Sequence, residues 1–119
     1  MPRVSVVAKN YAKALLDAAT KHKSVDQVAS DLDVFKKNFS ADFANELKNP
    51  VISKEDLVEI VSQITKKLSL TELTSNFFSI LAGNRRIELF LEVCQEFKRL
   101  ERYQKNILEV EVIVAVKAD

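Results

Sequence analysis

The chain has 119 residues, of which 47% are hydrophobic, so it is long enough to bury the core of one domain and too apolar to stay disordered. One glycine and two prolines leave few helix breakers, which favours long helices over a turn-rich β architecture. A net charge of +1 gives no general attraction to nucleic acid or anionic lipid, and no run approaches the roughly 20 apolar residues that span a bilayer. With a single cysteine, we expect a soluble chain in a reducing compartment, without direct insertion into a membrane.

Helical spacing of apolar residues begins near the N-terminus. The first predicted helix runs from about Val4 to Lys21, and it is richer in alanine and wider on its apolar side than contact with one neighbour requires. Ser24 and Gln27 form a capping-box pattern that opens a second helix, with an apolar stripe over residues 25–39.

Two breaks divide the middle of the chain. Residues 41–47 have the spacing of a short third helix, which Asn49-Pro50 stops because the residue before a proline is pushed out of the helical region. Ser53, with Asp56 three residues later, then opens a fourth helix. The apolar stripe of this helix consists of Leu57, Ile60, Val61, Ile64 and Leu68.

Residues 69–103 are predicted to form two helices folded back on each other. The fifth helix opens at Ser69-Leu70-Thr71-Glu72 and ends at Gly83, the only glycine. Asn84-Arg85-Arg86 leads at once into a sixth amphipathic helix over residues 87–103. Neither helix carries a recognisable catalytic residue, so we interpret the pair as an assembly surface rather than an active site.

The apolar period changes near the C-terminus. From Leu108 to Val116 apolar residues alternate, which is typical of a strand, yet no second convincing strand exists to pair with it. The sequence therefore predicts an all-α fold, a compact six-helix bundle over residues 1–105. Residues 106–119 are predicted to be an extended linker or strand that would begin a second, missing domain.

No set of side chains has the pattern of a catalytic or metal site. A general acid–base pair needs a carboxyl group whose pKa is raised in a cleft, whereas the acidic residues fall on predicted polar faces. Cys94 shares a face with Phe90 and Phe97, so we expect a small core residue rather than a nucleophile. His22 has no metal-ligand spacing to that cysteine. The sequence predicts no enzyme activity, no cofactor and no metal.

Surplus apolar surface on the first and fifth helices predicts a binding groove. Tyr11, Ala14 and Ala18 form a strip beside the inward face of the first helix, and Asn76 and Ile80 lie beside that of the fifth. Small residues beside these larger side chains would make a shallow groove that fits an amphipathic helix of a partner. On spacing alone, the alternative that all five residues are ordinary bundle core fits equally well.

Three segments, in order along the chain, resemble one family. Tyr11-Ala12-Lys13-Ala14-Leu15 is similar to the YAxAL signature in the first helix of the delta subunit of bacterial F-type ATP synthases, which the mitochondrial oligomycin-sensitivity-conferring protein shares. Asn49-Pro50 resembles the break before the family's fourth helix. Residues 76–87 (NFFSILAGNRRI) resemble the segment NFLxLLaeNgRL, and Phe97 and Leu100 match the FxxL that follows.

Two positions depart from the last motif. Arg85 stands where a glycine is common, and Gly83 stands where a larger residue is usual. We therefore expect that the turn between the fifth and sixth helices has shifted.

The resemblance implies a non-catalytic stator subunit of a rotary, proton-translocating ATP synthase. Its helical N-terminal domain would sit on the catalytic head and bind the N-terminal helix of an alpha subunit between its first and fifth helices. Carried over by position, the groove residues are Tyr11, Ala14, Ala18, Asn76 and Ile80, in agreement with the strip derived from spacing.

The resemblance also implies a place in the complex. The missing C-terminal domain would contact the b subunits of the peripheral stalk, and the subunit would keep the head from turning with the rotor. It would be peripheral, on the cytoplasmic face of the bacterial inner membrane or, alternatively, on the matrix face of the mitochondrial inner membrane.

A small helical RNA-binding module of the antitermination-factor kind is the alternative. The basic doublets Lys66-Lys67, Arg85-Arg86 and Lys98-Arg99 would favour it. Acidic residues interleave with most of them, however, and no aromatic side chain is set among them to stack bases. The sequence therefore favours a protein partner over nucleic acid.

Overall fold

The structure is a computed structural model that describes the backbone of residues 4–117 and the side chains of residues 4–107. Its elements in chain order are α1 (Val6–Lys21), α2 (Val25–Asn38), α3 (Ala41–Glu46), α4 (Lys54–Lys67), α5 (Glu72–Gly83), the 3-10 turn η1 (Ile87–Leu89) and α6 (Phe90–Lys117). The described residues contain six α-helices and no strand, so the predicted all-α, six-helix fold is confirmed.

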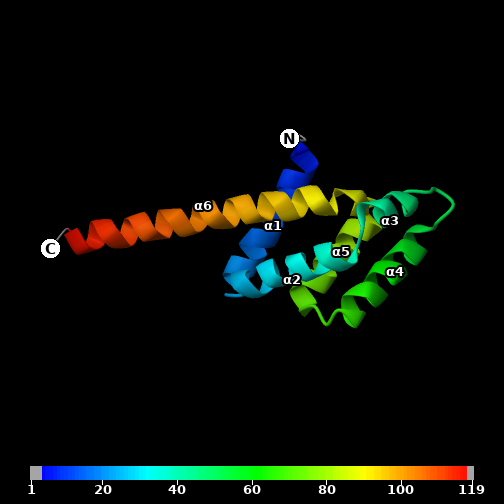
Figure 1. Cartoon of the computed structure of the whole chain (residues 1–119), viewed down its shortest axis with the longest axis horizontal. Helices are drawn as coiled ribbons and strands as arrows, with labels where there is room; N and C mark the ends of the chain where they lie inside the picture. Colours follow the sequence, from blue (N-terminus) through cyan, green and yellow to red (C-terminus); the bar gives the residue numbers. More distant parts are fainter. Residues whose placement is uncertain (1–3, 118–119) are drawn as a thin grey trace.

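Two pairs of helices organise the molecule. α1 packs most extensively on α6, and α4 packs most extensively on α5, while α2 contacts both α6 and α5. Figure 1 shows α1 crossing the long α6, with α2 to α5 gathered on one side and the C-terminal half of α6 extending beyond them. The molecule therefore measures 64 × 30 × 21 Å along its principal axes.

Phenylalanine rings from three elements meet in the core. Phe35 of α2 stacks on Phe78 of α5 with 3.8 Å between ring centroids and an interplanar angle of 13°. Phe90, at the start of α6, meets Phe35 edge to face at 5.8 Å and Phe39 at 5.0 Å. All four rings are buried, so α2, α5 and α6 share one aromatic centre.

A buried carboxylate of α2 caps α5. Asp31 is only 5% exposed, and its Oδ2 accepts hydrogen bonds from the backbone N–H of Thr71 (3.0 Å) and from the Thr71 hydroxyl (2.6 Å). Thr71 is the N-cap of α5 but makes no side-chain capping bond of its own. Because a negative charge is favourable at a helix N-terminus, Asp31 fixes where α5 begins relative to α2.

We predict that Asp31→Ala lowers the free energy of unfolding by about 1–3 kcal/mol, since it leaves the first turn of α5 without its acceptors. Asp33→Ala on the same helix is the matched control. Its exposed carboxylate pairs with Lys98 at 2.9 Å on the surface and should contribute at most about 1 kcal/mol. Urea denaturation measures both variants, and equal losses would contradict the capping role.

Three helices end in the same turn without a glycine. α1, α4 and α5 are followed by Lys23, Ser69 and Arg85, with φ of 55°, 56° and 56°, the left-handed region that favours glycine. After α4, for example, Ser69 N–H donates to Lys66 O (3.0 Å) and Leu70 N–H donates to Thr65 O (3.1 Å). These paired bonds satisfy the last carbonyls of each helix, so hydrogen bonding offsets the backbone strain.

The turn after α5 has its left-handed residue beyond the glycine. α5 ends at Gly83 as predicted, but that glycine does not have a positive φ. The left-handed residue is Arg85, at the position where the family motif has its glycine, and a shift of this turn relative to the family stays a prediction. Arg85 Nη2 also donates to Ile52 O at 2.6 Å, which holds the turn against the loop before α4.

We predict that Ser69→Gly stabilises the fold by about 0.5–1 kcal/mol, because glycine adopts the left-handed conformation without steric cost. Ser30→Gly is the matched control, since Ser30 is an exposed residue within α2. There the same chemical change should destabilise the fold by about 0.5 kcal/mol through helix propensity. Thermal melts of the two variants should shift in opposite directions, and shifts of the same sign would argue against left-handed strain at Ser69.

The predicted capping box at the start of α2 is wrong. Ser24 is the N-cap, but its side chain makes no capping bond and its Oγ is buried without a hydrogen-bond partner among the described residues. The reason is that Ser24 also completes the turn after α1, where its N–H donates to Ala19 O at 2.8 Å. By contrast, the side chains of Ser5, Ser40 and Ser53 do cap α1, α3 and α4.

The C-terminal segment differs from the strand that alternation predicts. α6 continues as a helix from Phe90 to Lys117 through the predicted extended segment. An isolated strand would leave its backbone groups unpaired, and the described residues offer no strand to pair with, whereas a helix satisfies them internally. The division of the chain after residue 105 stays a prediction.

Glu96 of α6 is a second buried carboxylate. Arg99, one turn later, donates to it from Nε (2.7 Å) and Nη2 (2.8 Å). These hydrogen bonds lower the pKa of Glu96 below its ordinary value of 4.5.

A lowered folded-state pKa means that Glu96 stabilises the fold above pH 4.5 and loses this contribution as the pH falls through the lowered pKa. We therefore predict that the stability difference between wild type and Glu96→Gln shrinks between about pH 7 and about pH 3. Glu46→Gln, at an exposed position, is the control and should change the stability only slightly. A constant difference for Glu96→Gln would contradict the pairing.

Candidate functional site

The structure places all five predicted groove residues outside the buried core. Ala14 and Asn76 are exposed, Tyr11 and Ala18 are half-buried, and Ile80 is 58% exposed, one of the few large apolar side chains at the surface of the described part. The alternative of ordinary bundle core therefore does not describe Ala14, Asn76 and Ile80, whereas Tyr11 packs against the edge of the core.

Tyr11 joins α1 to α5. Its ring meets the buried ring of Phe77 edge to face, with 6.2 Å between centroids, and its phenol oxygen accepts a hydrogen bond from Asn84 Nδ2 at 2.8 Å. The helices α1 and α5 thus touch at Tyr11. On α1, a shallow hollow of about 370 Å³ is lined by Val7, Asn10, Tyr11 and Ala14.

Asn84 joins the candidate site although its place in the sequence predicted only a turn. It follows the last residue of α5 and begins the segment that leads to α6. The available signal was its spacing: Asn84 lies seven residues after Phe77, two helical turns along the same face, so both face Tyr11. That the partner would be the Tyr11 phenol could not be deduced from spacing.

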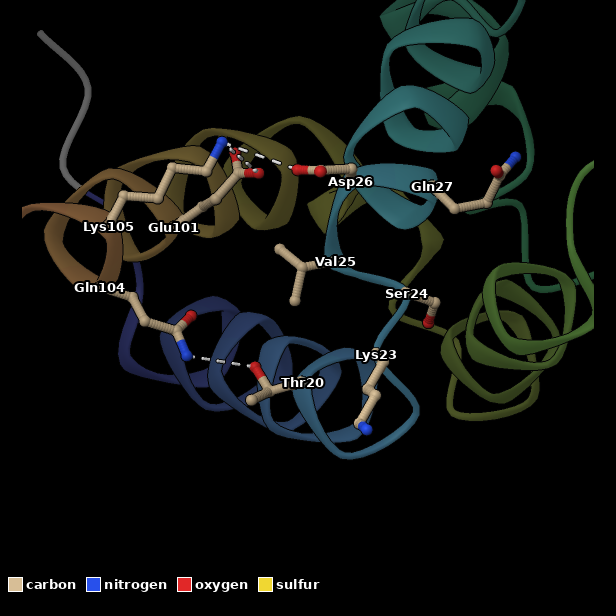
Figure 2. Close-up of a pocket in the computed structure, with 9 residues that line it drawn as sticks. All are labelled: Thr20, Lys23, Ser24, Val25, Asp26, Gln27, Glu101, Gln104 and Lys105. Atoms are coloured by element: carbon tan, nitrogen blue, oxygen red, sulfur yellow. Dashed lines mark hydrogen bonds and ion pairs between the residues drawn. The ribbon is translucent and has the colours of Figure 1, made fainter. Parts of the chain in front are cut away.

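A larger cleft lies at the C-terminal end of α1 (Figure 2). It has a volume of about 660 Å³ and is lined by Thr20, Lys23, Ser24, Val25, Asp26, Gln27, Glu101, Gln104 and Lys105. Val25 points into the space. On one side, Gln104 Nε2 donates a hydrogen bond to Thr20 Oγ1 at 3.3 Å. On the other side, Lys105 forms ion pairs with Asp26 and Glu101. Its two lysines and two carboxylates leave it without net charge, so it has no electrostatic preference for an ion.

The side chains that could do chemistry are arranged for structure. Cys94 is 3% exposed, and burial raises the pKa of its thiol to about 12, so it is protonated and unreactive at neutral pH. No group of three or more His, Cys, Asp or Glu side chains within the described residues could hold a metal ion. Within the same residues, every helix is too short or too polar to cross a membrane.

Three of the four side chains in the basic doublets of α6 and of the turn before it are engaged within the molecule. Lys98 pairs with Asp33, Arg99 pairs with Glu96, and Arg85 donates to a backbone carbonyl. These contacts reduce the charge that the doublets present to a polyanion.

Comparison with known proteins adds the decisive observation. The family of the ATP synthase delta (OSCP) subunit matches residues 7–119 of the chain. The chain belongs to the ATP synthase delta (OSCP) subunit family. The resemblance found in the three sequence segments is thereby confirmed, and it extends over nearly the whole of this delta-family chain.

Its relatives include bacterial and mitochondrial proteins. ATP synthase subunit delta of Methylobacterium nodulans is 33% identical over 111 residues, which cover 92% of this chain and 58% of that protein. ATP synthase subunit delta of Rhodopseudomonas palustris is 32% identical over 118 residues, with coverages of 98% and 63%. ATP synthase subunit 5, mitochondrial, of Pichia angusta is 31% identical over 111 residues, with coverages of 92% and 57%. The chain thus spans about three-fifths of the length of these relatives.

Proposed function

We propose that this delta-family chain is part of a non-catalytic stator subunit of a rotary ATP synthase, and that α1 and α5 form a groove for the N-terminal helix of an alpha subunit. The family match over residues 7–119 carries the assignment to the synthase. The exposure of Ala14, Asn76 and Ile80, with Tyr11 and Ala18 half-buried beside them, supports the groove, because a docking surface must be accessible in the free protein.

The shape of the surface fits a helix. Ala14 and Ala18 lie one turn apart on α1 and carry the smallest apolar side chains, so a partner backbone can approach closely. Ile80 stands on the opposite wall as a large apolar anchor, and Tyr11 lies between the two helices. An amphipathic helix would cover these side chains with residues at i, i+3 and i+4, which is the usual helix-in-groove arrangement.

The mechanical role follows from the family. A subunit that holds the catalytic head by an alpha-subunit helix, and the b subunits of the peripheral stalk through a C-terminal domain, resists rotation of the head without any catalytic group. Its location would be peripheral, on the cytoplasmic face of the bacterial inner membrane or on the matrix face of the mitochondrial inner membrane. We favour this protein-binding role over the RNA-binding alternative, since basic side chains of the doublets are engaged by acidic partners.

We predict that Ala14→Asp or Ile80→Glu abolishes binding of an alpha-subunit N-terminal peptide in calorimetric titration. Covering an unpaired carboxylate with the partner helix should cost several kcal/mol, on the order of a hundredfold or more in affinity. Because both positions are exposed, the variants should melt close to wild type.

Ala41→Asp on α3 and Val51→Glu, where the side chain is 87% exposed, are the matched controls and should bind like wild type. Folded Ala14→Asp and Ile80→Glu proteins that bind the peptide with unchanged affinity would refute the groove.

A further inference from the structure

A polar contact bridges the two walls of the groove. Asn84 Nδ2 donates to the phenol oxygen of Tyr11 at 2.8 Å, across 73 positions in the sequence. A phenol can accept one hydrogen bond while donating its own proton in another. In this contact Tyr11 is the acceptor, so its proton is left available for a second partner.

Both residues are held in place by their surroundings. Asn84 is the C-cap of α5, with its N–H donating to Ile80 O at 3.0 Å, and the next residue, Arg85, is fixed to Ile52 O. On the other wall, the Tyr11 ring rests edge-on against Phe77. The direction of the phenol is therefore set before any partner binds, which reduces the entropic cost of using it.

We propose that Asn84 is a positioning residue of the groove, which orients the Tyr11 phenol so that its proton is donated to a side-chain oxygen of the bound helix. This inference rests on the proposed function, because it takes the alpha-subunit helix as the occupant. In the free protein the contact is exposed, so the phenol O–H can donate a hydrogen bond to water. A helix that covers the groove removes that water, so it must supply an acceptor in exchange.

The partner chemistry follows from this geometry. A glutamate, aspartate, glutamine, asparagine, serine or threonine facing Tyr11 offers an oxygen acceptor, whereas a lysine or arginine offers only donors. A partner with an apolar or basic residue at that turn leaves the phenol proton without an acceptor and binds more weakly. The otherwise apolar groove thus gains one directional contact that selects among amphipathic helices and fixes their register.

The test uses the whole chain and an alpha-subunit N-terminal peptide in calorimetric titration. Tyr11→Phe removes the phenol O–H donor. Asn84→Asp replaces the amide donor with a carboxylate, which accepts the hydrogen bond of the phenol O–H and so keeps it from the partner. Each change should weaken binding roughly five- to tenfold, and the double variant should bind no more weakly than Tyr11→Phe alone. Asn84→Ala should lose less, because the phenol proton stays available although its direction is no longer set.

Matched controls separate this effect from general ones. Tyr103→Phe on α6 and Asn45→Asp on α3 make the same chemical changes at exposed positions away from the groove and should bind like wild type. The loss in Asn84→Asp should persist at about 0.5 M salt, where the added surface charge is screened.

Tyrosine fluorescence gives a second readout that a purely structural role would not move. The chain has two tyrosines and no tryptophan, so in a Tyr103→Phe background Tyr11 is the only strong emitter. Peptide binding should change its emission, and Asn84→Asp should reduce that change.

The outcomes distinguish this inference from the function on which it rests. If the wild-type chain does not bind the peptide, the proposed groove and the role of Asn84 are both refuted. If Ala14→Asp abolishes binding while Tyr11→Phe or Asn84→Asp binds like wild type, the groove stands and the role of Asn84 is refuted. Additive losses in the double variant, or an unchanged Tyr11 emission on binding, would overturn the role of Asn84 as well.

Discussion

The stack of Phe35 on Phe78 determines how α5 is rotated about its own axis. With Phe78 turned into the aromatic centre, the next residue back, Phe77, points toward α1, and Asn76 and Ile80 are left on the outer side of α5. Asp31 fixes the start of the same helix, so α5 is set in rotation by an aromatic contact and in position by a capping carboxylate. The surface that we assign to a partner is thus a consequence of core packing on the opposite side of the helix.

Most of the helical framework could be predicted because its signals are local. Apolar spacing located the helices, and Ser53 caps α4 where the pattern predicted. Ser24 shows the limit of such signals, because it belongs both to the turn after α1 and to the start of α2. Its backbone N–H closes the turn after α1, and its side chain does not cap α2. The alternating valines after Leu108 show another limit: alternation favours a strand only where a second strand supplies hydrogen bonds.

The proposed groove could be derived in part for the same reason. The small and apolar residues of the strip are visible from helical spacing, and none of them belongs to the buried core of the structure. The contact between Tyr11 and Asn84 was not predictable, because it depends on how α1 and α5 are brought together by helices that lie between them in sequence. Left-handed turns at lysine, serine and arginine were hidden too, since the residue type usually used to find them is glycine.

The two helices of the proposed groove pack on different neighbours. α1 packs chiefly on α6 and α5 packs chiefly on α4, while the ring of Phe77 and the amide of Asn84 contact Tyr11 between α1 and α5. The distance between these two helices is therefore set by how α1 packs on α6 and how α5 packs on α4 and the aromatic centre. In the proposed groove, substitutions in those distant contacts would change the fit of a partner helix without altering any residue that faces it.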